Sequence, residues 1–193
     1  MAEILLGDLP EANAARLGAE RWAIRHGDDV LSWGALADGA RRRARALAAA
    51  GVAPGERVVL ALPNCNALFE LTFALWKIGA TPTMVSARLP RAELEAIVQL
   101  AEPRAVVVAD AALREALGAL PPEFGSNHPD GLPLETTLSP CWKVMTSGGS
   151  TGRPKLIVDH NPARMDGAAF NQLGIPDDSV LLNAGPLYHN FPF

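Results

Sequence analysis

The chain has 193 residues, of which 49% are hydrophobic and 20% charged, and its mean hydropathy is +0.11. This composition is typical of a folded globular protein and excludes a disordered one. The net charge of −4 argues against a nucleic-acid binder, because such domains are usually basic. No apolar stretch reaches the roughly 18 residues that a membrane-spanning helix requires. The chain has two cysteines, no Cys/His spacing of a metal site and no basic leader, so we expect a cytoplasmic protein that acts on small molecules.

The first quarter of the chain predicts a short helix, a hairpin and a longer helix. Residues 8–17 suit a short helix, and the turn residues His26-Gly-Asp-Asp29 between two strand-like runs indicate a hairpin. Ser32 is placed to cap a helix over 33–50, which Gly51 would end. The arginines of that helix favour a solvent-exposed face over an anion-binding patch. They are Arg41, Arg42, Arg43 and Arg45.

The middle of the chain alternates between strand-like and helix-like segments. Strands are expected over 57–62, 81–85 and 105–108, and helices over 67–79, 91–100 and 112–117. Asn64 is a candidate cap for the first of these helices. The continuous apolar run over 57–62 is typical of a buried parallel strand. The pattern predicts an α/β fold, a layered, parallel-rich sheet with flanking helices.

A change of composition divides the chain. Residues 121–140 contain five prolines and two glycines, which favours a loop or linker. We therefore expect an N-terminal βα subdomain over 1–120, a proline-rich linker or loop over 121–140, and the start of a second subdomain over 141–193.

Two strand-like runs, expected over 142–147 and 155–159, bracket a loop rich in glycine and hydroxyl groups. Such a loop offers three kinds of phosphate ligand: backbone N–H groups freed by glycine at positive φ, hydroxyl donors, and an ammonium group. These residues are Gly148, Gly149 and Gly152, then Thr146, Ser147, Ser150 and Thr151, and finally Lys155. Pro154 before the lysine and Leu156 after it exclude the nucleotide P-loop pattern. A flexible surface hairpin is the alternative that composition alone leaves open.

Counted back from its lysine, Ser147-Gly-Gly-Ser-Thr-Gly-Arg-Pro-Lys155 closely resembles the phosphate-binding signature of the adenylate-forming (AMP-binding) superfamily, Thr-Ser-Gly-Thr-Thr-Gly-x-Pro-Lys. This superfamily includes acyl-CoA synthetases, luciferases and the adenylation domains of non-ribosomal peptide synthesis. Gly148 stands where the family usually has a second hydroxyl, a departure that would reduce contacts with the phosphates. The resemblance implies that the loop binds the β- and γ-phosphates of ATP, above all through Ser147, Ser150, Thr151 and Lys155.

Further landmarks of the same family occur in order along the chain. They are Ser32-Trp-Gly-Ala-Leu-Ala, Gly51-Val-Ala-Pro-Gly-Glu-Arg-Val, Leu62-Pro-Asn, Trp76-Lys-Ile-Gly-Ala-Thr-Pro and Gly185-Pro-Leu-Tyr-His-Asn-Phe-Pro-Phe193. The last resembles the family's substrate-pocket motif, which makes Tyr188, His189 and Asn190 candidate pocket residues. A structural role for His189 is the alternative. The forms of the loop and of this motif are most similar to CoA ligases of fatty, aromatic or steroid acids, bile acids among them.

The resemblance implies the N-terminal part of the large domain of an adenylate-forming enzyme. In such an enzyme a small carboxylic acid attacks the α-phosphate of ATP and releases pyrophosphate, and the thiol of CoA then attacks the acyl adenylate. Mg²⁺ and positively charged groups would neutralise charge on the phosphates. The later family motifs, including the catalytic lysine of a C-terminal domain, are absent from the 193 residues. We therefore expect an N-terminal fragment that is inactive by itself, and we assign no catalytic residue and no metal ligand within it.

A non-catalytic truncated module, which binds phosphate weakly or pairs with another chain, is the alternative function. In either case the apolar runs at 57–62, 144–145 and 156–158 suit central strands with neighbours on both sides. An incomplete sheet would leave an unpaired edge and an exposed apolar face, which favour association. We expect the fragment to self-associate, and we expect no nucleic-acid partner.

Overall fold

The computed structural model describes residues 3–129, 134–147, 154–166, 174, 176 and 179–189. Its centre is a five-stranded sheet in the order β6-β4-β5-β7-β8, in which only the pairing of β7 with β8 is antiparallel. The strands are β4 (Arg57–Ala61), β5 (Thr81–Met84), β6 (Ala105–Val108), β7 (Lys143–Ser147) and β8 (Lys155–Asp159). The predicted α/β fold with a parallel-rich sheet is confirmed.

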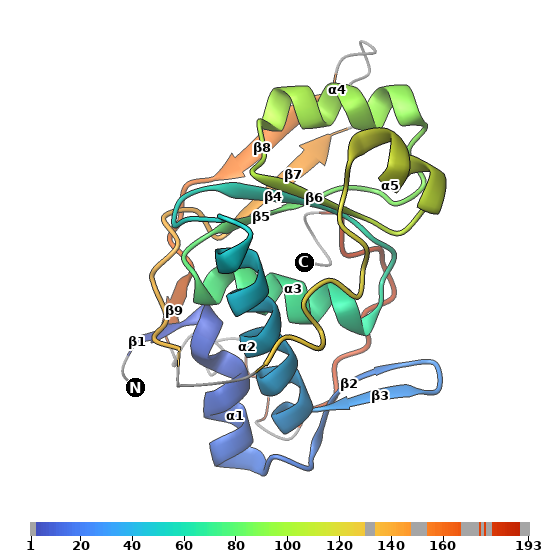
Figure 1. Cartoon of the computed structure of the whole chain (residues 1–193). Helices are drawn as coiled ribbons and strands as arrows, with labels where there is room; N and C mark the ends of the chain where they lie inside the picture. Colours follow the sequence, from blue (N-terminus) through green and yellow to red (C-terminus); the bar gives the residue numbers. More distant parts are fainter. Residues whose placement is uncertain are drawn as a thin grey trace.

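Helices cover both faces of this sheet (Figure 1). On one face lie α2 (Trp33–Ala49) and α3 (Asn66–Lys77), with α1 (Leu9–Leu17) against α2. On the other face lie α4 (Arg91–Ala101) and α5 (Ala111–Leu117). Buried leucines of α3, Leu71 and Leu75, pack with Leu60 and Met84 on the first face. The second face buries Leu94 and Ile97 of α4, so the sheet is apolar on both sides, as its continuous hydrophobic runs predict.

Two small antiparallel sheets complete the described structure. The predicted hairpin forms from β2 (Trp22–His26) and β3 (Asp29–Ser32). The second sheet joins β1 (Glu3–Leu5), which the short 3-10 helix η1 (Leu6–Asp8) follows, to β9 (Arg164–Asp166). Neither β1 nor β9 is predicted from the sequence, because three residues are too few for a periodic pattern. This sheet ties the first described residues to a segment beyond the β7–β8 hairpin.

The predicted helix caps have different outcomes at α2 and α3. The Ser32 hydroxyl accepts the Ala35 N–H at 3.2 Å, which confirms the cap of α2. Asn64 does not cap α3, so that prediction is wrong. The N-cap residue of α3 is Cys65, whose side chain makes no capping hydrogen bond. The Asn64 side chain is instead hydrogen-bonded to a backbone segment more than 120 residues later in the chain.

The solvent-exposed arginine face expected on α2 is also wrong. Arg43 is only 3% exposed, and its Nε donates to Glu70 Oε2 of α3 at 2.7 Å. Its Nη1 donates to two backbone carbonyls, of Pro122 at 2.7 Å and of Phe124 at 2.8 Å. Residues 121–129 fold over this part of α2 and α3, and Arg43 links the three segments. The remaining arginines of the predicted face are half-buried.

The proline-rich segment does not separate two sheets. Strands from before and after it pair directly, because β7 lies beside β5 with Thr83 opposite Val144. Its described residues also contact the preceding part, as in the hydrogen bond from the Thr137 N–H to the Lys77 carbonyl at 3.0 Å. The predicted subdomains 1–120 and 141–193 therefore share one sheet, and their separate folding stays a prediction.

Gly79 forms the turn between α3 and β5, and its replacement is expected to destabilise the fold. Its φ is +74°, and a Cβ there would lie 2.8 Å from Thr137 Cγ2. Gly27 has a comparable φ of +62° in the β2–β3 turn, but a Cβ there would meet nothing within 4 Å. We expect Gly79→Ala to lower the free energy of unfolding, measured by urea denaturation, by about 2 kcal/mol or more, and Gly27→Ala by about 1 kcal/mol. Equal losses of stability in the two variants would show that the close approach of the added Cβ to Thr137 costs no free energy.

Candidate functional site

The candidate phosphate-binding loop is carried by an antiparallel hairpin. Its two strands are β7 and β8, with Ser147 opposite Lys155 and Thr146 opposite Leu156. The two strands predicted on either side of the loop are therefore confirmed. The hairpin brings a hydroxyl residue and the candidate lysine to adjacent strand ends. Lys155 is exposed, and Thr146 and Ser147 are half-buried.

The remaining candidate residues of the loop lie outside the described residues. They are Gly148, Gly149, Ser150, Thr151 and Gly152. The expected positive φ of the glycines and the hydroxyl contacts of Ser150 and Thr151 therefore stay predictions. What the structure establishes is the pair of strand ends between which these residues run.

The hairpin loop leaves the sheet at its carboxyl edge. Because β4, β5 and β7 run parallel, their carboxyl ends meet at one edge, and Ser147 is the last residue of β7 there. Open parallel sheets bind their ligands at this edge, outside the carboxyl ends of the strands. A phosphate-binding loop in this position would present its ligands where small molecules usually bind to such sheets.

The candidate pocket motif is attached to the same edge through Asn64, which follows β4. The Leu187 N–H donates to Asn64 Oδ1 at 2.9 Å, and Asn64 Nδ2 donates to the Gly185 carbonyl at 3.0 Å. One strand, β5, separates β4 from β7, so the two strand ends lie about 10 Å apart. Figure 1 shows this late segment returning to the sheet beside β4 and α3. The fold thus brings two motifs that are about 40 residues apart in sequence to one edge.

Within this segment Leu187 is buried and the next two residues form an aromatic pair. The ring centroids of Tyr188 and His189 lie 4.6 Å apart. Tyr188 packs partly against the core cluster that contains Leu187, whereas His189 is exposed. The third candidate pocket residue, Asn190, lies outside the described residues. An exposed His189 is not a buried structural histidine, and its role in a pocket stays a prediction.

The other end of the hairpin is fixed by packing and charge. Trp76 Nε1 donates to the Trp142 carbonyl at 2.6 Å, and the two indoles stack with centroids 6.4 Å apart. Lys143 is buried, with Nζ 4.2 Å from the centroid of the Trp142 ring, and its burial lowers the pKa of the ammonium group. Burial also disfavours the charged form of the Cys141 thiol and so raises its pKa. These groups anchor the first residue of β7 and lie away from the loop.

Asp159 faces Lys143 across the hairpin and has a lowered pKa. Burial alone would raise this pKa, but hydrogen bonds from Trp142 and Asn161 and the positive charge of Lys143 outweigh it. A carboxyl group whose pKa is lower in the folded state stabilises the fold above its unfolded pKa, and this stabilisation is lost as the pH falls through the folded pKa.

Asp159→Asn is therefore expected to change the acid stability of the chain. The free energy of unfolding of the variant should lie below that of the unchanged chain near neutral pH, and the gap should narrow as the pH falls below 3.8, the ordinary value for this group. Urea denaturation at a series of pH values measures the gap. Asp28→Asn, in the β2–β3 turn, controls for the loss of one negative charge. A difference in the free energy of unfolding that stays constant down to the acid transition would contradict the lowered pKa of Asp159.

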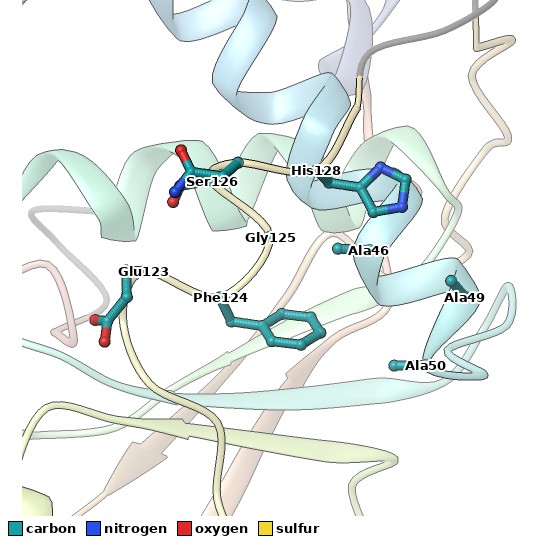
Figure 2. A pocket seen from close by; sticks show the side chains of 9 residues that line it. Ala46, Ala49, Ala50, Glu123, Phe124, Gly125, Ser126 and His128 are labelled. Atoms are coloured by element: carbon teal, nitrogen blue, oxygen red, sulfur yellow. The ribbon is translucent and has the colours of Figure 1, made fainter.

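One hollow among the described residues lies away from the candidate site. It has a volume of about 450 Å³ and lies between the C-terminal end of α2 and residues 123–128 (Figure 2). Ala46 and Ala49 of α2, its C-cap residue Ala50, Phe124 and His128 are among the residues that line it. None of the candidate site residues contributes to it. The described part of the chain also holds no group of three or more His, Cys, Asp or Glu side chains placed to bind a metal ion.

None of the helices in the described residues combines the length and apolar character needed to cross a membrane.

Sequence reasoning missed the part that Asn64 takes in this site. It recognised Asn64 within a family landmark but interpreted the side chain as a helix cap. The position of Asn64 in the sequence could have indicated this role. Asn64 closely follows a buried parallel strand, and residues at the carboxyl ends of such strands lie where open sheets bind their ligands.

Comparison with known proteins identifies the family of the chain. The family model described as AMP-binding enzyme matches residues 10–193. Feruloyl-CoA synthase of an Amycolatopsis species is 31% identical over 198 residues, a match that covers 95% of this chain and 39% of that protein. The 2,3-dihydroxybenzoate-AMP ligase of Bacillus subtilis is 30% identical over 216 residues, covering 96% of this chain and 39% of that protein. The chain thus spans about two fifths of the length of these relatives.

A solved structure shows the same fold. The o-succinylbenzoate CoA synthetase of Bacillus subtilis, in complex with its acyl-adenylate intermediate, superposes with a TM-score of 0.76 over 97% of this chain and 51% of that chain, at 19% identity. The fold is therefore that of the N-terminal part of the large domain, as the resemblance of the loop and the other landmarks implies. Because the family model covers nearly all of the sequence, the chain belongs to the AMP-binding enzyme family.

Proposed function

We propose that the chain is the N-terminal part of an AMP-forming acid–CoA ligase and contributes its ATP-phosphate loop. The observation that supports this most strongly is the β7–β8 hairpin, in which Ser147 lies opposite Lys155 at the carboxyl edge of the sheet. The names of the relatives support activation of a carboxylic acid as the reaction class, since these names refer to the synthesis of an acyl-CoA and to an acid–AMP ligase. A longer enzyme would supply the remaining motifs, and its compartment would be the cytoplasm.

In this proposal the loop acts on the leaving pyrophosphate. The ammonium group of Lys155 and the hydroxyls of Thr146, Ser147, Ser150 and Thr151 would interact with the β- and γ-phosphates of ATP. The carboxylate of the substrate would attack the α-phosphorus, the bond to the bridging oxygen would break, and pyrophosphate would carry away the negative charge. Donors fixed before the reaction stabilise that developing charge without reorganisation.

Mg²⁺ would enter this site together with ATP. Magnesium binds proteins through few ligands and keeps contacts with substrate phosphates and water. The hydroxyl-rich hairpin end is chemically compatible with oxygen ligation. CoA would be the second substrate and would accept the acyl group as a thioester.

The acid is proposed to be a small aromatic or aliphatic carboxylic acid that contacts the segment of Tyr188, His189 and Asn190. The rings of Tyr188 and His189, which are tilted by 50° to each other, would offer aromatic contacts to an aryl ring. The names of several relatives refer to ferulate, dihydroxybenzoate and succinylbenzoate. Aryl acids are therefore the first compounds to test, followed by fatty and bile acids.

Exchange of labelled pyrophosphate into ATP tests the proposal. The assay uses the chain joined to the portion that completes it to the length of its relatives, with one carboxylic acid at a time. Exchange that depends on one class of acid, followed by a CoA thioester of that acid, is the expected result. Failure of every acid to support exchange in a folded, completed enzyme would refute the proposed function.

The second candidate concerns the 193 residues by themselves, as a non-catalytic module that binds phosphate weakly or pairs with another chain. In the described structure β8 has a single neighbouring strand, β7, so it does not have the two neighbours predicted for residues 156–158. Ile157 of this strand is 46% exposed, and Leu181 and Leu182 are 69% and 92% exposed. An unpaired strand edge and exposed apolar side chains each favour association.

We therefore expect the 193-residue chain to self-associate and to lack exchange activity without its complement. Light scattering across micromolar concentrations should give masses above the 20.4 kDa of one chain. Ile157→Lys, which adds a charge to the β8 edge, should shift the population toward the monomer. A stable monomer throughout would contradict the association, and exchange well above background would contradict the inactivity.

A further inference from the structure

The side chain of Asn64 holds a late segment of the chain by two backbone hydrogen bonds. Its carbonyl oxygen accepts the Leu187 N–H at 2.9 Å, and its amide nitrogen donates to the Gly185 carbonyl at 3.0 Å. The partners lie 123 and 121 residues away in sequence. Asparagine suits this position because one planar group carries both an acceptor and a donor. Aspartate would keep the acceptor and lose the donor, and leucine of similar size would lose both.

The held segment has little regular structure of its own. Residues 179–189 include no helix or strand. The hydrogen bonds described within it are local, from the Gly185 N–H to Asn183 Oδ1 and from the His189 N–H to the Pro186 carbonyl. Leu187 is 4% exposed and inserts into the core beside the sheet. Asn64 and the Leu187 side chain thus supply long-range contacts that fix where the segment lies.

These contacts set the position of the residues that follow. Tyr188 and His189 come directly after the residue that Asn64 binds, and a shift of Leu187 by one residue would move both rings away from the carboxyl edge. Asn64 itself follows β4, whose end lies about 10 Å from the end of β7, where the phosphate loop begins. The fold therefore couples the placement of the aromatic pair to the sheet that carries the loop.

We propose that Asn64 is a positioning residue for the acid-binding side of the site: it fixes the segment 185–189 so that Tyr188 and His189 face the carboxylic acid. This inference rests on the proposed ligase function. Loss of the two hydrogen bonds should weaken acid binding, because the rings would be misplaced, whereas ATP binding depends on the hairpin loop and should be retained. The expected signature is a rise in the KM for the acid with the KM for ATP unchanged.

The first test needs no activity and uses the 193-residue chain. Hydrogen exchange of the Leu187 amide is compared in the unchanged chain, Asn64→Leu, Asn64→Asp and the control Asn13→Leu, which alters an asparagine on α1 with a local side-chain contact. We expect exchange at Leu187 to accelerate about tenfold or more in Asn64→Leu, with the amides of β4 unchanged. Asn64→Asp, which keeps the acceptor for the Leu187 N–H, should give a smaller acceleration. Unchanged exchange in Asn64→Leu would overturn the inference.

The second test uses the completed enzyme and separates this inference from the proposed function. Asn64→Leu should raise the KM for the acid about tenfold and leave the KM for ATP unchanged, and Asn64→Asp should recover part of the loss. Equal changes in both KM values, or none, would overturn the positioning role. If Asn64→Leu does not fold, the two KM values of Asn64→Asp decide: a rise in the KM for the acid alone supports the positioning role, and equal changes or none overturn it. Absence of acid-dependent exchange in the unchanged enzyme would instead refute the ligase function, and the Leu187 amide would still decide whether Asn64 holds the segment.

Discussion

Lys155→Ala is expected to slow adenylation in the completed enzyme by about 10²-fold to 10³-fold, the cost of removing one preorganised charge-stabilising group. Lys155 is the first residue of β8, lies opposite Ser147 and is exposed. In the proposed reaction its charge acts on the pyrophosphate that leaves in the first step. The second step, attack of CoA on the acyl adenylate, contains no pyrophosphate, so thioester formation from supplied acyl adenylate should be largely unchanged.

Two single-turnover assays measure these half-reactions separately. Pyrophosphate release reports adenylation, and thioester formation from synthetic acyl adenylate reports the transfer to CoA. Lys155→Arg keeps the positive charge and serves as the matched control, with an expected loss much smaller than that of alanine. Comparable losses in both half-reactions for Lys155→Ala would show that the assignment of the loop is wrong.

Arg43→Leu is expected to have the largest effect on stability, a loss of about 3–5 kcal/mol in the free energy of unfolding. The substitution leaves Glu70 without its buried partner and removes the donor to the carbonyls of Pro122 and Phe124. Breaking one side of a buried pair is costly because the remaining charge is not solvated. Urea denaturation of the chain measures the loss.

The same substitution at an exposed ion pair provides the control. Arg91 pairs with Glu95 at 2.7 Å on α4, and its side chain is 61% exposed. Arg91→Leu should cost no more than about 0.5 kcal/mol, because exposed helix pairs contribute little. If the two variants lose the same stability, Arg43 does not link α2, α3 and the 121–129 segment as described.

Local patterns in the sequence are sufficient to predict most of the elements. The alternation of apolar runs and amphipathic segments predicts the four parallel strands and the helices between them, because burial on two faces leaves a continuous hydrophobic run. Ser32 before α2 and Gly51 after it mark that helix by local chemistry. These signals depend on neighbours within a few residues, which are visible in the sequence.

The errors concern side chains whose partners are distant in sequence. Arg43 lies among arginines on a helix, and nothing nearby indicates that carbonyls 79 and 81 residues later will bury it. Asn64 lies one residue before Cys65, the N-cap residue of α3, yet the partners of its side chain lie more than 120 residues away. Polar side chains take whichever partner the tertiary fold supplies, so their roles follow from topology.

The candidate site divides in the same way. The flanking strands of the loop are predictable from hydrophobic patterning, and the antiparallel register of Ser147 with Lys155 follows from the hairpin. The assignment of the loop to ATP phosphates comes from family resemblance, since glycine and hydroxyl content alone also fits a surface turn. The approach of the segment 185–189 to the end of β4 required the structure, because no local pattern links the two.

The fate of the carboxylate oxygens tests the central claim most directly. With both carboxylate oxygens of the acid labelled with ¹⁸O, attack on the α-phosphorus of ATP places one labelled oxygen between the acyl carbon and phosphorus, and attack by CoA then leaves that oxygen on AMP. Mass spectrometry of the products of the completed enzyme should therefore find one ¹⁸O in AMP for each acyl-CoA formed, and none in pyrophosphate. Unlabelled AMP, or label in inorganic phosphate with ADP as the nucleotide product, would contradict the account.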